Sequence, residues 1–148
     1  MALEIAEHNS DKNEIIIIGI AENGVFIAEK TAGYLREVFN GNVKTISLLI
    51  NKKSPAEIVL SEKINLQGKM IILADDVANS GRTMLYALRP LLDQYPAQVE
   101  TLALVERTHK LFPVALNYVG LSVSTSADEN IAVIVENGEI MGAEMIHK

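Results

Sequence analysis

Four consecutive isoleucines, Ile15 to Ile18, form an unbroken apolar run that ends at Gly19. A strand with one wet face would alternate apolar and polar residues, so this run is typical of a strand buried on both faces of a parallel sheet. A second such run, over residues 70–74, ends in Asp75 and Asp76. Strands of this kind need cover on both sides, which favours an α/β fold.

Helical and strand-like patterns alternate along the chain. Helical apolar spacing predicts one helix over residues 24–39, with Asn23 as its N-cap, and a second beginning at Gly81 with Pro90 inside it. Leu3 and Ile5 indicate part of a further helix at the start of the chain. Further strands are expected over residues 43–49, 99–105, 118–123 and 131–136, with one short strand within 57–66. Asn137 and Gly138 predict a tight turn after the last strand. The order predicts a three-layer α/β sandwich with a mostly parallel central sheet, whose ligands bind at the carboxyl ends of the strands.

Composition excludes several classes of protein. The 148 residues are 49% hydrophobic and 22% charged, as expected for one globular domain over residues 1–148. No apolar run is long enough to span a membrane, the start lacks a secretory pattern, and the chain has no cysteine, so we expect a cytoplasmic protein without disulfides. The net charge of −6 argues against binding of nucleic acid by bulk electrostatics.

The segment from Asp75 to Thr83 carries the chemistry. An apolar strand ends in two carboxylates, and a loop of small and hydroxyl residues then enters a helix. The first-turn amides of a helix bind anions, Ser80 and Thr83 add hydroxyl donors, and Gly81 lets the backbone approach a phosphate. Paired carboxylates accept hydrogen bonds from vicinal hydroxyls or hold a divalent cation. The pattern therefore predicts a site for a sugar phosphate, although Asp75 and Asp76 could instead cap the helix and Asn79 could merely hold a bend.

This segment resembles the phosphoribosyl-diphosphate (PRPP) motif of type I phosphoribosyltransferases, with Ser80 in the position of the first threonine. The resemblance implies that Asp75 and Asp76 act as the catalytic carboxylates by facing the ribose hydroxyls. The residues that it assigns to PRPP and its 5′-phosphate are Asp75, Asp76, Ala78, Asn79, Ser80, Gly81, Arg82 and Thr83.

The resemblance continues into the pyrimidine-operon regulator/uracil phosphoribosyltransferase branch of this family. The runs Leu-Val-Glu-Arg-Thr-His-Lys-Leu-Phe-Pro at 104–113 and Asn-Tyr-Val-Gly at 117–120 are similar to the base side of that branch's pocket. The residues thereby placed at the base are Arg107, His109, Tyr118 and Val119. The residues in the place of the pyrophosphate loop are Ala21, Glu22, Asn23 and Gly24. From the residues alone, Arg107 and His109 could equally be structural side chains at the end of a strand.

Three features depart from that branch. Its pyrophosphate loop carries a lysine and an arginine, where this chain has neutral residues and Glu22. The loop that closes over substrate is short here and leaves Lys52 and Lys53 as diphosphate partners. The chain begins inside its first helix, so we expect a reduced hood. In purine-using relatives a carboxylate occupies the position of Asn79, and a neutral amide there favours a pyrimidine substrate or an absence of catalysis.

The expected function is transfer of ribose 5-phosphate from PRPP to a nucleobase such as uracil, with Mg²⁺ bound to the PRPP. The expected assembly is a homodimer without membrane or nucleic-acid partners. Two alternatives stay open: a catalytically weak or inactive relative that binds PRPP or a nucleotide, motivated by Glu22 and Asn23, and a nucleotide-sensing regulator that acts on RNA.

Overall fold

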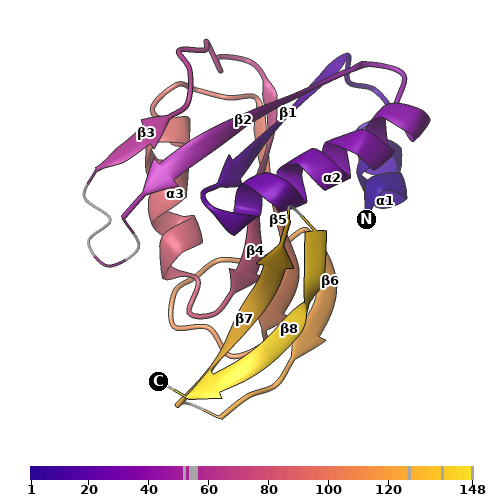
Figure 1. Ribbon diagram of the computed structural model, residues 1–148. Helices are drawn as coiled ribbons and strands as arrows, with labels where there is room; N and C mark the ends of the chain where they lie inside the picture. The colour runs from indigo at the N-terminus through magenta and orange to yellow at the C-terminus, as the bar shows by residue number, and fades with distance from the viewer. Residues whose placement is uncertain (52, 54–56, 127, 138, 148) are drawn as a thin grey trace.

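The computed structural model describes residues 1–51, 53, 57–126, 128–137 and 139–147 (Figure 1). The elements, in chain order, are α1 (Ala2–His8), β1 (Glu14–Ile20), α2 (Asn23–Val38), β2 (Asn42–Ile50), β3 (Ile58–Leu60), β4 (Met70–Ala78), α3 (Arg82–Leu92), β5 (Gln98–Arg107), β6 (Tyr118–Val123), β7 (Glu129–Glu136) and β8 (Glu139–His147). One sheet has the order β3-β2-β1-β4-β5-β6, and its pairs are parallel except β2 with β3. The predicted α/β sandwich with a mostly parallel sheet is confirmed.

The two apolar runs form the two central strands of this sheet. Ile15 to Ile18 are at most 1% exposed, because β1 lies between β2 and β4 and is covered on both faces. Ile15 and Ile17 pack with α1 and α2 on one face, whereas Ile16 and Ile18 pack with α3 on the other. The continuous hydrophobicity therefore reflects alternate side chains that enter two separate cores.

Two predicted boundaries are wrong. Asn23 does not cap α2: it is the first residue of the helix, Glu22 holds the N-cap position, and no side chain caps the first turn. The strand predicted to end before Asp75 continues to Ala78, because β5 extends beside it and pairs with it as far as Glu106. None of the helices described is long and apolar enough to cross a membrane.

The carboxyl-terminal strands form a separate hairpin. β7 pairs antiparallel with β8, from Glu129 opposite His147 to Glu136 opposite Glu139. The sequence patterns did not predict β8; the predicted turn includes Asn137, which has a positive φ of 51°, and Gly138, which lies outside the described residues. The hairpin lies across the carboxyl ends of β4 and β5 (Figure 1), and Ile131 of β7 is buried among the apolar side chains there.

Candidate functional site at the carboxyl ends of the strands

The β4–α3 connection forms a hollow of about 120 Å³. The lining residues are Asp75, Val77, Ala78, Asn79, Ser80, Gly81, Arg82, Thr83 and Met84. Helix α3 begins at this hollow with Gly81, which has no side chain, in the N-cap position, so first-turn amide groups and the positive end of the helix dipole face the space. The segment that the sequence assigned to a sugar phosphate is thus a single concave loop at a helix N-terminus.

Gly81 gives this loop its shape. It has a φ of +87°, a left-handed conformation that a residue with a side chain rarely adopts. A Cβ here would also lie 3.3 Å from the carbonyl oxygen of Phe112, because the β5–β6 connection packs against the loop. The carbonyl of Ser80 accepts hydrogen bonds of 3.0 Å from the amides of Leu111 and Phe112. The hydroxyl of Ser80 accepts the amide hydrogen of Arg82 at 3.2 Å. The loop is therefore held in shape by its own backbone and by this neighbouring connection.

Asp75 and Asp76 are both buried, and their carboxylates have different neighbours. Asp75 lines the hollow beside α3, and its Oδ1 would lie 3.2 Å from a Cβ on Gly24, whereas the Asp76 carboxylate contacts Asn23 at the start of α2. Oδ2 of Asp76 accepts a 3.0 Å hydrogen bond from the amide of Asn23, and its Oδ1 accepts from the backbone of Val77 at 2.8 Å. A ligand in the hollow meets Asp75 first.

The segment corresponding to the pyrophosphate loop approaches β4 from α2. The peptide bond between Ala21 and Glu22 is cis, and the side chain of Glu22 is exposed. Gly24 is buried against β4, and a Cβ at this position would lie 2.8 Å from the carbonyl oxygen of Ala74. Asn23 bonds to Asp76, as described above, and thereby ties this segment to the paired carboxylates.

Two further predicted site residues contact the hairpin. The side-chain amide of Asn79 donates to the carbonyl of Ile131 at 3.0 Å and accepts the amide hydrogen of the same residue at 2.8 Å. Arg107 is 3% exposed, and its Nη1 donates to the carbonyl of Glu129 and to Oδ1 of Asn130, each at 3.0 Å. The structure thus gives both side chains contacts within the protein that the motif did not indicate.

The structure does not bring Tyr118 and Val119 to the hollow. Tyr118 is fully buried and points toward α1, where its hydroxyl donates to the Glu100 carboxylate at 2.9 Å and lies 3.3 Å from Nδ1 of His8. Burial and the Glu100 carboxylate raise the pKa of Tyr118 well above its ordinary value. Val119 pairs with Ala103 inside the sheet. The burial of Tyr118 against α1 contradicts its predicted place beside a base, whereas Val119, which is half-buried, stays a predicted base-side residue.

The basic segment after β5 lies near the hollow. His109 is exposed, and Lys110 is close enough to the loop that a Cβ on Gly81 would lie 3.6 Å from its Cδ. Nζ of Lys110 donates to Glu106 at 3.1 Å. The sequence analysis assigned no separate role to Lys110; its position just after the carboxyl end of a parallel strand was the signal that could have found it. Lys53 is exposed, and Lys52 lies outside the described residues.

Comparisons with known proteins agree with this geometry. The chain matches the phosphoribosyl transferase domain over residues 1–136. It is 33% identical to the "Bifunctional protein PyrR" of Pediococcus pentosaceus, covering 89% of this chain and 81% of that protein. It is also 33% identical to the protein of the same name from Streptococcus thermophilus, covering 97% and 85% of the two chains.

Solved structures show the same fold. The hypoxanthine phosphoribosyltransferase of Trypanosoma cruzi superposes with a TM-score of 0.75 at 17% identity, covering 83% of this chain and 73% of that one. A hypoxanthine-guanine phosphoribosyltransferase of Bacillus anthracis gives a TM-score of 0.67 at 20% identity, covering 88% and 75%. With the concave β4–α3 loop and the paired carboxylates in place, the chain belongs to the type I phosphoribosyltransferase family, in the pyrimidine-operon regulator/uracil phosphoribosyltransferase branch, and is a pentosyltransferase.

Proposed function

We propose that the enzyme transfers ribose 5-phosphate from PRPP to a pyrimidine base such as uracil. The observation that carries this proposal is the concave loop from Asp75 to Met84, in which one carboxylate, two hydroxyl residues and the N-terminus of α3 line a single hollow. The helix amides, with Ser80 and Thr83, bind the 5′-phosphate. Asp75 accepts hydrogen bonds from the ribose hydroxyls, and Asp76 supports it from the adjacent strand position.

The reaction needs no covalent nucleophile. A base nitrogen forms the new bond to C1 of the ribose while the bond from C1 to the diphosphate oxygen breaks, and the base nitrogen loses its proton to water. Positive charge develops on the ribose ring in the transition state. Two carboxylates held in a largely buried site stabilise that charge, and positioning supplies much of the remaining rate enhancement.

Magnesium fits this site as part of the substrate. Among the described residues there is no group of three or more acidic, histidine or cysteine side chains that would hold a metal unaided. Mg²⁺ characteristically uses one or two carboxylates together with substrate phosphates, and Asp75 and Asp76 supply that number. The ion would offset the charge of the diphosphate, which this chain's Ala21, Glu22, Asn23 and Gly24 cannot do.

The base preference is supported by Asn79. The side-chain amide of Asn79 cannot exchange a proton with a purine ring nitrogen as a carboxylate could. It is hydrogen-bonded to the backbone of Ile131 in the hairpin. The test is a steady-state assay with PRPP and Mg²⁺ and each of uracil, cytosine, hypoxanthine and guanine. Transfer to uracil is expected, and transfer confined to the purines would contradict the proposed base.

The same assay separates the second candidate, a relative that binds PRPP or nucleotide without turnover. Glu22 and Asn23 in place of cations favour that candidate. It predicts that PRPP binds in calorimetry while no base gives product. RNA binding is a separate property: with a net charge of −6 we expect weak, salt-sensitive binding to a pyrimidine-operon leader RNA, which a gel shift at physiological salt would measure.

A further inference from the structure

The free edge of β7 is paired with side chains in place of a neighbouring strand. In an antiparallel pair, alternate residues turn both backbone groups toward the partner strand or away from it. Residues 129, 131 and 133 turn their carbonyl groups away from β8 and toward the six-stranded sheet. The three contacts are Arg107 Nη1 donating to Glu129 O at 3.0 Å, Asn79 Nδ2 donating to Ile131 O at 3.0 Å, and Asn23 Nδ2 donating to Val133 O at 3.3 Å.

Asn79 makes the most complete of these contacts. Its amide carries one acceptor and one donor group, and both meet the backbone of the same residue, Ile131, at 2.8 and 3.0 Å. A residue of a neighbouring strand would make the same two hydrogen bonds, one donated and one accepted, to the backbone of an edge strand. The side chain of Ile131 is 4% exposed and packs with Val105 and Val133, so polar and apolar contacts hold β7 at the same place.

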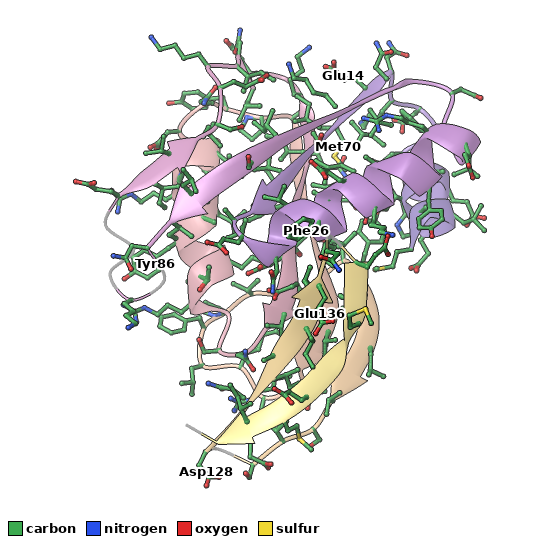
Figure 2. The ribbon with its side chains drawn as sticks, viewed as in Figure 1. Glu14, Phe26, Met70, Tyr86, Asp128 and Glu136 are labelled. Carbon is green, nitrogen blue, oxygen red and sulfur yellow. The ribbon has the colours of Figure 1, made fainter. Side chains whose placement is uncertain are left out.

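The three side chains come from three separate parts of the site. Asn23 begins α2 and also bonds to Asp76, Asn79 belongs to the concave loop, and Arg107 ends β5. Figure 2 shows the resulting placement: Asp128 and Glu136 mark opposite ends of β7, and Glu136 lies at the end toward α2. Lys30 of α2 reaches the adjacent strand, where its Nζ donates to Glu139 at 2.8 Å. The hairpin is thereby fixed beside the loop that lines the hollow.

We propose that Asn79 is a positioning residue that acts through β7. Together with Asn23 and Arg107 it holds the free edge of β7 as a wall of the site, and the position of this wall sets how well a nucleobase fits beside the bound ribose phosphate. The Asn79 amide is oriented toward Ile131 by one donated and one accepted hydrogen bond, and we assign the phosphate to the helix amides with Ser80 and Thr83. This inference rests on the proposed function and adds a determinant of base binding to it.

The test compares Asn79→Ala, Asn79→Asp and the control Gln94→Ala. Asn79→Ala removes both contacts with Ile131, whereas Asn79→Asp keeps the acceptor for the Ile131 amide and loses the donor. Gln94 is a matched control, because its amide oxygen also joins two segments by accepting from the backbone of Leu66 at 3.0 Å, at the opposite end of the strands. Three quantities are measured: hydrogen exchange of the β7–β8 peptides, affinity for ribose 5-phosphate, and KM for the nucleobase.

A positioning role predicts a specific combination of results. Loss of two hydrogen bonds in Asn79→Ala should speed exchange of the β7–β8 peptides by about tenfold or more. The KM for the base should rise by about the same factor, with affinity for ribose 5-phosphate within about twofold of the wild type. Asn79→Asp should give values between those of the wild type and Asn79→Ala, both for the exchange rate of the β7–β8 peptides and for the KM of the base. Gln94→Ala should leave all three quantities unchanged. Its effect on hydrogen exchange should be confined to the peptides near residue 66.

Two results would overturn the proposal. One is unchanged hairpin exchange in both Asn79 variants. The other is a loss of ribose 5-phosphate affinity as large as the rise in KM, which would mean that Asn79 contacts the ligand itself. If the wild type transfers to no base, the proposed function fails, and hairpin exchange with ribose 5-phosphate affinity still decides whether Asn79 positions β7. If Asn79→Ala does not fold, the same three measurements on Asn79→Asp decide the question.

Discussion

The side-chain amide of Asn23 donates to Oδ2 of Asp76 across 3.0 Å and joins segments that are 53 residues apart in the sequence. The other oxygen of Asp76 accepts from the backbone of Val77, so the carboxylate is held from two directions. A neutral amide orients this carboxylate without neutralising it. In the proposed reaction, we expect this carboxylate to stabilise a ribose ring that becomes positive during transfer.

Replacing both carboxylates should weaken PRPP binding selectively. In the double variant Asp75→Asn, Asp76→Asn, two charged acceptors are lost, and each hydrogen bond to a charged group contributes about 1.5–3 kcal/mol, so PRPP affinity should fall by on the order of a hundredfold or more. Binding of inorganic phosphate should stay the same or tighten. The measurement is a pair of calorimetric titrations, PRPP with Mg²⁺ and phosphate alone. Equal losses for both ligands would show that the pair does not bind ribose.

The two carboxylates should also differ from each other. Asp75 lines the hollow, whereas Asp76 is bonded to Asn23, so Asp75→Asn should account for the larger share of the loss in PRPP affinity. Titration of each single variant, Asp75→Asn and Asp76→Asn, with PRPP and Mg²⁺ measures the two contributions separately. A larger loss of PRPP affinity for Asp76→Asn would contradict this prediction.

Substitution of Gly81 by alanine should impair the phosphate site and the fold together. A φ of +87° costs a residue with a side chain about 1–2 kcal/mol, and the new Cβ would press on the carbonyl of Phe112 at 3.3 Å. Gly68→Ala is the matched control, because Gly68 also has a positive φ, of 70°, but nothing lies within 4 Å of its Cβ position. Chemical denaturation should show a loss of stability for both variants. Only Gly81→Ala should lose phosphate affinity, and loss in both would contradict this placement of the phosphate.

The buried Tyr118 should make the protein sensitive to alkali. Its pKa is raised in the folded state, so its contribution to the free energy of unfolding is complete below the ordinary tyrosine pKa near 10 and is lost as pH rises above that value. Tyr118→Phe removes the hydrogen bond to Glu100 and should lower stability by about 1.5–3 kcal/mol at pH 7. The difference between wild type and variant should shrink above pH 10. Denaturation curves from pH 7 to 11 measure this, with Tyr95→Phe, at a side chain 79% exposed, as control; a constant difference would refute it.

We expect the protein to form a homodimer through its α1–α2 face. Leu3 and Tyr34 are 65% and 63% exposed on α1 and α2, two helices that contact each other, and exposed large apolar side chains on adjoining elements favour an interaction surface. Sedimentation at micromolar concentration should give about twice the chain mass of 16.2 kDa. Leu3→Glu with Tyr34→Glu should halve that mass, whereas Leu92→Glu, at a side chain 56% exposed at the end of α3, should not. A wild-type mass of one chain would contradict the expectation.

The sequence predicted the centre of the molecule better than its edges. The isoleucines of β1 and the apolar run of β4 could be assigned because burial on both faces leaves a continuous pattern. The concave loop was found for a similar reason, since its small, hydroxyl and acidic residues are adjacent in the chain. The strand β8 was missed because its exposed Met141 and Met145 give no clear alternation.

The contacts of the site residues could not be predicted from spacing. Asn79 and Ile131 are 52 residues apart, and Asn23 and Val133 are 110 apart, so only the folded chain shows that they meet. Tyr118 illustrates the reverse error. It lies in a run similar to the base side of relatives, but its strand register and its contact with Glu100 place it in the core. Local similarity did not reveal the direction of that side chain.

The hairpin β7–β8 belongs to a different sheet from the one that carries the motif, and the side chains of Asn79, Arg107 and Asn23 bond to its outer edge. A strand that joined the central sheet would have to keep its register with every neighbour, whereas this one meets the sheet through side-chain contacts and a small apolar cluster. Changes at its exposed positions therefore leave the strand pairing of the sheet undisturbed. In evolution, or in an engineered library of the exposed hairpin positions, the surface beside the β4–α3 loop can diversify while Asp75 and Asp76 stay where they are.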